Sequence, residues 1–407
     1  MIFQNNLNRN LLLFLILLFG AIISYHRGSN FSDGDSYSVI LAFLNFIDNG
    51  IYTPSRGAYG HPIPEFIIGL TSYYLGTSYS NILCFTFLFF ALIFLYKTFL
   101  NNTKSLFLFV LLVLSNSYVF LENTNSIDYP IAIFFFSVGL FLFKEKRYIL
   151  SYFFLGFSIA SRANFLTFVY PLLFIYYIDL LNNKSIKKIF ISFLIVSLSG
   201  LIFYLPLFKL HDFSLAFLEI PFLMEKNNSD GWYGGPKLEF KSLFPRFIYK
   251  VYLLTGIFSS IYILFYIKGI LKYLMNNFKE NLIFLSIIFI NIFIFFFMPT
   301  KILVINPFII FFYIILFKYF DLKKIYILIL FNFIQWIAIY DFANITYKTQ
   351  NICFAKEAIK YEFTFSLKKG VFVEYFLNEK DMSVCYSQFM GKYSENFKKG
   401  KPLRLSK

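Results

Sequence analysis

Long apolar segments recur along almost the whole chain, and they restrict its fold more than any other feature of the sequence. About 20 consecutive apolar residues form a helix long enough to cross the hydrocarbon core of a bilayer. Charged residues make up only 14% of the 407 residues, whereas soluble globular chains carry about a quarter. This much apolar surface cannot be buried in one water-soluble core, which excludes a soluble enzyme. We predict an all-α polytopic membrane protein.

The apolar segments predict about eleven membrane-spanning helices. The first covers residues 11–25, after Arg9, and ends at His26 and Arg27. No signal-peptidase pattern of small residues follows it, so we expect an uncleaved signal anchor. The other spans are expected at residues 79–96, 105–121, 129–143, 148–161, 164–181, 188–208, 247–267, 281–298, 301–317 and 325–340.

The distribution of Lys and Arg between these segments predicts their orientation. Alternate connections, at 122–128, 161–163 and 299–301, carry at most one basic residue each, and the others are rich in them. By the positive-inside rule the basic connections are cytoplasmic, with the N-terminus inside and the C-terminus outside, most simply in a bacterial inner membrane. The net charge of +15 is thus assigned to topology and not to nucleic-acid binding. The basic connections contain Lys97, Lys104, Lys144, Lys146, Arg147, Lys184, Lys187, Lys188, Lys268, Lys272, Lys279, Lys318, Lys323 and Lys324.

This topology divides the chain into a membrane domain, residues 1–340, and a small extracytoplasmic C-terminal region, 341–407. Two outer loops are expected in the membrane domain, at 26–78 and 209–246. Residues 62–76 are apolar, but counting them as a span would place every lysine cluster outside. We therefore expect a helix that lies along the outer face. The C-terminal region alternates apolar and charged residues, which predicts a small α/β structure.

Eight ionisable residues are predicted to share the outer face. Ionisable groups at a membrane are costly to bury, so they are the first candidates for function. Acids and cations together beside the lipid boundary fit an anionic lipid substrate with an activated head group. The eight residues are Asp33, Asp35, Arg56, His61, Glu65, Asp128, Arg162 and Lys301.

The two acids of the first outer loop have two interpretations. Asp35 precedes Ser36 and an amphipathic segment over 36–49, so it could cap a helix. Alternatively, one carboxylate serves as general base for an acceptor hydroxyl, and Asp33 orients it or shares a divalent cation, Mg²⁺ or Mn²⁺, with it.

Each of the remaining candidate residues also has both a structural and a functional interpretation. Arg162 and Lys301 stand at span ends, where basic side chains either extend to the interface or bind a lipid phosphate. Asp128 could cap the helix that follows it, and His61 could be an ordinary loop residue. No metalloprotease, nucleotide-binding or serine-hydrolase motif is present, so the energy for a transfer must arrive in the substrate.

The first outer loop resembles that of GT-C-fold glycosyltransferases, above all protein O-mannosyltransferases and lipid A aminoarabinose transferases. The resemblance rests on Gly34-Asp35-Ser36-Tyr37, on residues 48–54, and on Gly60-His61-Pro62-Ile63-Pro64 before an apolar helix. It continues at Asp128, Arg162 and Lys301 and covers roughly residues 10–320. Ser36 stands where the family usually has Glu, and His61 where it commonly has Lys.

The resemblance implies transfer of a sugar from a polyprenyl-phosphate donor to a glycan, lipid or protein acceptor at the outer membrane face. It implies that Asp35 is the general base, with Asp33 as its partner or a metal ligand. Arg162 and Lys301 would hold the donor phosphate and stabilise the leaving group.

Two other functions remain open. An O-antigen polymerase or ligase also uses prenyl-linked glycans, but it depends on arginines in a large outer loop, and loop 209–246 has only Arg246. A lipid-linked glycan transporter predicts ionisable residues in mid-membrane and internal repeats.

Overall fold

The computed structural model describes residues 2–30, 39, 42–43, 46–47, 50, 52, 54–55, 60–75, 77–100, 105–178, 183–210, 212–213, 240–297, 306–341 and 346–347. These residues are mostly helical, which confirms the predicted helical class. The helices are α1 (Ile2–Asn30), α3 (Pro62–Leu75), α4 (Thr77–Phe99), α5 (Leu106–Ser115), α6 (Ser117–Asn123), α7 (Asp128–Lys144), α8 (Tyr148–Ser161), η1 (Ala163–Phe165), α9 (Leu166–Ile178), α10 (Asn183–Leu201), η2 (Ile202–Tyr204), α11 (Leu205–Leu210), α13 (Phe240–Thr255), α14 (Ile257–Asn276), α15 (Phe278–Phe297), α16 (Asn306–Tyr319) and α17 (Leu322–Ile339).

Two short strands, β1 (Tyr340–Asp341) and β2 (Thr346–Tyr347), pair antiparallel after α17. The rest of the predicted C-terminal α/β region lies outside the described residues.

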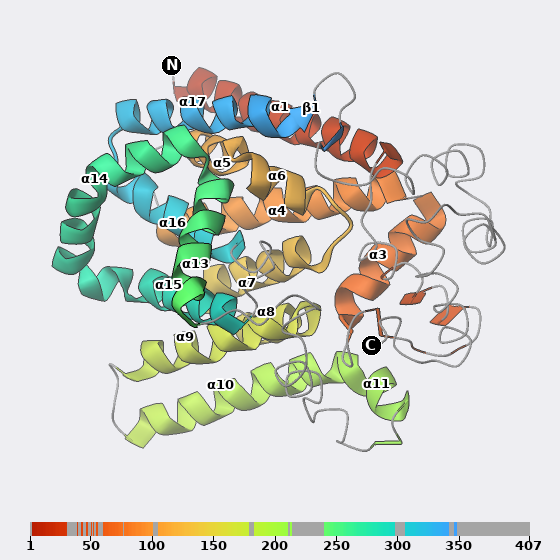
Figure 1. The fold of residues 1–407 in the computed structure, drawn as a ribbon. Coiled ribbons are helices and arrows are strands. Elements are labelled where there is room, and N and C mark those ends of the chain that lie inside the picture. Colours follow the sequence, from red (N-terminus) through yellow and green to blue (C-terminus); the bar gives the residue numbers. More distant parts are fainter. Residues whose placement is uncertain are drawn as a thin grey trace.

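Five helices pack in series, α1 on α4, α4 on α7, α7 on α8 and α8 on α10 (Figure 1). A second group, α16 and α17 with α14 and α15, packs around α5 and α9. Phe136 of α7 joins the two groups, because its ring contacts Phe165, Phe168 and Phe311. The core between the helices combines aromatic contacts of this kind with a larger number of buried Leu, Ile, Val and Ala side chains.

Three helices in the described part of the chain are long and apolar enough to cross a membrane: Tyr79–Phe99, Ile186–Lys209 and Ile257–Asn276. Six other apolar helices are shorter, with 10–17 residues each. A helix is present in the predicted segment 62–76, as α3, and Pro62 stands at its start, where a missing N–H costs nothing. The described residues of the amphipathic segment 36–49 are also helical.

Two segments that we predicted as single spans are broken in the structure. Residues 105–121 form α5 and α6, separated at Asn116, whose backbone is extended and whose side chain accepts a hydrogen bond from the Val119 N–H. An Asn side chain competes with the helical backbone in this way. Residues 247–267 break at Gly256, which has a φ of +78° and whose missing Cβ would lie 2.9 Å from the Gln335 side chain. Hydropathy alone does not reveal either break.

The two breaks are joined by a buried hydrogen-bond network. Asn116 donates to the Leu254 carbonyl at 2.7 Å and to the Tyr313 hydroxyl at 3.0 Å. Asn332 of α17 accepts from the hydroxyls of Ser259, at 2.8 Å, and Tyr313, at 3.3 Å. Its amide also donates to α5, to the Leu112 carbonyl and the Ser115 hydroxyl. The network thus ties α17 to both broken helices.

We expect Asn332→Leu to lower the free energy of unfolding by about 2 kcal/mol, because side-chain hydrogen bonds between membrane helices contribute about 0.6 kcal/mol each and four are lost. Thermal unfolding in detergent measures this loss. Asn291→Leu is the matched control, since Asn291 is also buried and, among the described residues, donates to Ile287 of its own helix. Equal losses in the two variants would contradict a role for the network.

Candidate functional site

Asp128 is the first residue of α7 and is completely buried. The preceding turn is held against α4: the Ser126 hydroxyl donates to Asn81 at 2.6 Å and bonds the Ser80 hydroxyl, and the Cys84 thiol contacts the Ile127 carbonyl. A helix N-terminus carries partial positive charge, which stabilises a carboxylate there. The fold therefore places one buried acid at a defined point.

Two nitrogen-bearing side chains from other elements, a guanidinium and an imidazole, contact the Asp128 carboxylate. Arg162 forms an ion pair with Oδ2, and the Nε2 atom of His61 lies 3.3 Å from the same oxygen. The guanidinium of Arg162 also stacks on the buried ring of Tyr129, 3.6 Å from its centroid. The side chains of His61 and Arg162 are 15% and 13% exposed, so the cluster is nearly closed to solvent.

The position of Arg162 follows from how α8 ends. Arg162 has extended backbone angles, its N–H bonds the Ser158 carbonyl at 3.0 Å, and a turn of 3-10 helix begins directly after it. Behind this turn α8 and α10 touch at two glycines: a Cβ on Gly200 would lie 3.1 Å from the Gly156 carbonyl oxygen. The small residues let the backbones approach closely and so fix where Arg162 emerges.

Glu65 of α3 holds the loop that presents His61. Its Oε1 accepts the backbone N–H groups of Ser55 and His61, both at 2.8 Å, and its Oε2 accepts the Tyr52 hydroxyl. Gly60 is required between them, because it has a φ of +63° and its Cβ would lie 2.6 Å from the Tyr52 hydroxyl. The network links Glu65 to the Asp128 cluster through the backbone of His61.

Burial raises the pKa of Glu65, and its hydrogen bonds with Ser55, Tyr52 and His61 oppose this only in part. The pKa of Tyr52 is also raised, first by burial and then by the neighbouring Glu65. An acid whose folded-state pKa is raised stabilises the protein below its unfolded pKa, near 4.5, and loses that contribution as the pH rises through the folded value.

We therefore expect Glu65→Gln, which mimics the protonated acid, to be tolerated and to become relatively more stable than wild type as the pH rises. The expected result is a melting-temperature difference in favour of Glu65→Gln that is larger at pH 8 than at pH 5. Melting curves in detergent at the two pH values measure it. Asp321→Asn, which removes an exposed acid, is the control and should not change the slope. A difference that shrinks as the pH rises would contradict the argument.

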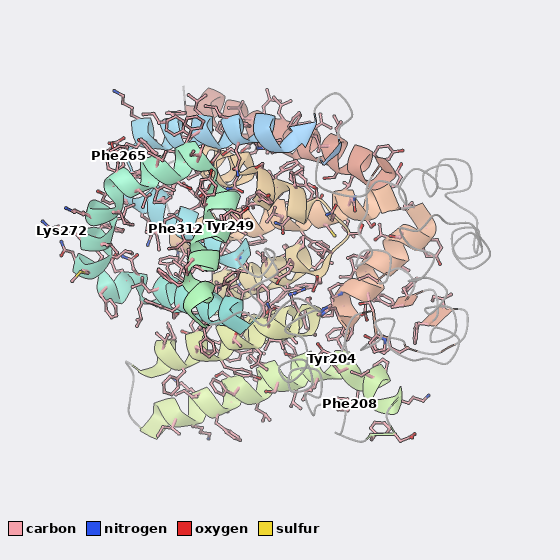
Figure 2. All side chains as sticks on the ribbon, in the orientation of Figure 1. Tyr204, Phe208, Tyr249, Phe265, Lys272 and Phe312 are labelled. Atoms are coloured by element: carbon pink, nitrogen blue, oxygen red, sulfur yellow. The ribbon has the colours of Figure 1, made fainter. Side chains whose placement is uncertain are left out.

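Tyr204 adds a polar group that the sequence did not indicate. It ends η2, which contacts α3. That hydroxyl is buried and has no hydrogen-bond partner among the described residues. Figure 2 shows Tyr204 where α10 leads into α11, near the ends of α3 and α8. No sequence signal marks it, because it lies inside an apolar segment of a chain with 31 tyrosines.

The structure thus brings together three of the predicted candidates, Asp128, His61 and Arg162, and connects Glu65 to them. The other four, Asp33, Asp35, Arg56 and Lys301, lie outside the described residues. The general base, the Mg²⁺ or Mn²⁺ site at Asp33 and Asp35, and the second phosphate-binding cation remain predictions. Within the described ranges, no group of three or more His, Cys, Asp or Glu could hold a metal ion.

Chemically, the described cluster offers a buried carboxylate, an imidazole and a guanidinium within contact distance. Such a set can orient a hydroxyl group, move a proton or stabilise a developing negative charge. The chain matches no family model, no curated protein and no solved structure.

Proposed function

We propose that this chain is a glycosyltransferase that moves a sugar from a polyprenyl-phosphate donor to a glycan, lipid or protein acceptor at the outer face of the membrane. The observation that carries the proposal is the buried Asp128 carboxylate, contacted by His61 and Arg162 at the ends of apolar helices. Buried ionisable groups at such a position are costly and are kept for function.

The site lies at the opposite end of its helices from the lysines. The Lys144 ammonium group donates to the Lys97 carbonyl at 2.7 Å, so the basic ends of α4 and α7 adjoin. Asp128 is at the other end of α7, whose 17 residues span about 25 Å at 1.5 Å per residue. Figure 2 likewise shows Lys272 at the edge of the molecule, away from Tyr204. If the lysines are cytoplasmic, the site faces outward.

The finer topology belongs to the same proposal. About eleven crossings in a bacterial inner membrane, with the N-terminus inside and the C-terminus outside, would place α3 along the outer surface. The apolar helices would then contact the prenyl chain, and the loop 209–246 would face the acceptor.

In this proposal Asp35 takes the proton from the acceptor hydroxyl as it attacks the anomeric carbon, and the polyprenyl phosphate leaves. Asp33 orients Asp35 or shares a divalent cation with it, and Lys301 contributes positive charge near the leaving group. Asp128 fixes His61 and Arg162 in one arrangement before substrate arrives. Preorganised charge of this kind accelerates transfer because it needs no rearrangement during the reaction.

Transfer by the purified full-length chain in lipid nanodiscs tests the proposal. Undecaprenyl phosphates carrying radiolabelled sugars are supplied with a crude envelope extract as acceptor. We expect label on an acceptor with wild type and Asp321→Asn, and loss of transfer in a folded Asp35→Asn. No transfer from any donor would contradict the function, whereas full activity of Asp35→Asn would contradict only its role as base.

A lipid-linked glycan transporter is the second candidate, because two discontinuous helices meet at Asn116 and Gly256, as in many transporters. In this chain, however, the Leu254 carbonyl at that meeting point already accepts the Asn116 amide. Movement of labelled lipid across vesicles without chemical transfer would favour the transporter.

A further inference from the structure

The charge of Arg162 is already neutralised inside the described cluster. Its guanidinium pairs with Asp128, and its face is covered by Tyr129. A phosphate is best bound by a guanidinium or ammonium whose charge and fork of N–H groups are available to it. Arg162 is therefore poorly placed to be a phosphate clamp, although the sequence predicted that role.

Two donors near the end of α8 nevertheless lack an acceptor. The Nε–H of Arg162 and the hydroxyl of Tyr204 are buried and have no hydrogen-bond partner in the described part of the chain. The Ser161 hydroxyl, next to Arg162, is in the same state. A buried donor without an acceptor is costly, and native structures keep few of them without a reason.

These groups come from different elements that meet near the end of α8. Arg162 follows α8, and Tyr204 ends η2, which contacts α3 and lies near the end of α8 (Figure 2). A carboxylate accepts hydrogen bonds, while the guanidinium and the phenol donate them. The ligand that satisfies both is neutral and carries several hydroxyl groups, each of which donates and accepts.

We propose that Asp128, Arg162 and Tyr204 form a subsite for the hydroxyl groups of a sugar ring, and not for the donor phosphate. This inference rests on the glycosyltransferase function proposed above and adds the part of the substrate that the cluster recognises. The donor phosphate is then left to cations such as Lys301. Tyr204 becomes a specificity-determining residue, because its hydroxyl reaches only a ring with a suitably placed oxygen.

Lipid binding to the full chain in nanodiscs separates the two roles. The probes are undecaprenyl phosphate, the same lipid carrying glucose, mannose, galactose, N-acetylglucosamine or arabinose, and those free sugars. In wild type we expect at least one sugar lipid to bind more tightly than undecaprenyl phosphate. We expect Tyr204→Phe and Arg162→Lys to lower the binding affinity for that sugar lipid about tenfold, which corresponds to about 1.4 kcal/mol. The affinity for undecaprenyl phosphate should change less than twofold.

Tyr170→Phe is the matched control, because the Tyr170 hydroxyl bonds Ser197 between α9 and α10, outside the cluster. It should leave all binding unchanged. Tyr204→Phe should also leave the melting temperature unchanged or raise it, since the lost hydroxyl made no bond within the described protein. A purely structural Tyr204 would instead lower the melting temperature and spare sugar binding, which would overturn the proposal.

The remaining outcomes are also decisive. Equal weakening of both lipids by Arg162→Lys would restore the phosphate clamp and overturn the sugar subsite. A wild type that binds undecaprenyl phosphate but no sugar lipid more tightly would overturn it as well. A variant effect on a free sugar alone would support the subsite and assign it to the acceptor glycan. No binding of any prenyl lipid would instead contradict the proposed function itself.

Discussion

Asp128→Asn is expected to lower the free energy of unfolding by about 3 kcal/mol and to reduce sugar transfer by at least about a hundredfold. The variant keeps the shape of the side chain but leaves the Arg162 guanidinium nearly buried without its counter-charge. Breaking a buried ion pair by removing one partner typically costs about 3–5 kcal/mol. Because Arg162 retains slight exposure, the lower end of that range applies. Transfer falls further because His61 loses the same partner.

Melting in detergent and transfer in nanodiscs measure the two effects. Asp321→Asn is the control: Asp321 is exposed and pairs with Lys324 one turn away, so its loss should cost under about 0.5 kcal/mol. The double variant Asp128→Asn with Arg162→Gln removes both charges and should be more stable than Asp128→Asn alone. A single variant as stable and active as wild type would refute the role given to the pair.

The sequence predicts that Asp128, His61, Glu65 and Arg162 lie at the same end of the helices. This prediction needs only the number of lysines in each connection between apolar segments, which can be counted locally. That Arg162 pairs with Asp128 could not. The two residues are 34 positions apart, and their contact depends on how α7 and α8 pack. From sequence alone the charge of Arg162 has no partner, which is why the sequence assigns it to a lipid phosphate.

The helix breaks were missed for a related reason. A hydropathy window averages over a single Asn116 or Gly256 and reports one continuous span. What breaks the helix is local at Asn116, where the side chain caps α6, and long-range at Gly256, where Gln335 of α17 excludes a Cβ. The helical class and the positions of most helices can thus be predicted from composition and from the lengths of the apolar segments. The breaks within helices depend on individual contacts and cannot be predicted in this way.

Gly156→Ala is expected to lower the free energy of unfolding by about 3 kcal/mol, the upper end of the usual cost of overpacking. A Cβ at this position would lie 2.6 Å from the Val196 carbonyl oxygen and 3.0 Å from the Gly200 nitrogen. Both are backbone atoms of α10 and cannot rotate away, so α8 and α10 must separate. Thermal unfolding in detergent measures the loss.

Gly139→Ala is the comparison variant, because its new methyl group would meet the Leu155 side chain at 2.8 Å and a backbone atom, the Leu155 nitrogen, only at 3.3 Å. We expect it to cost less than Gly156→Ala, since a side chain can shift more easily than a backbone. Separation of α8 from α10 also moves Arg162 away from Tyr204, so Gly156→Ala should weaken binding of a sugar lipid more than binding of undecaprenyl phosphate. If Gly156→Ala lost stability but kept that preference, Arg162 and Tyr204 would not act on one ring, and the contact between the two glycines would serve the fold alone.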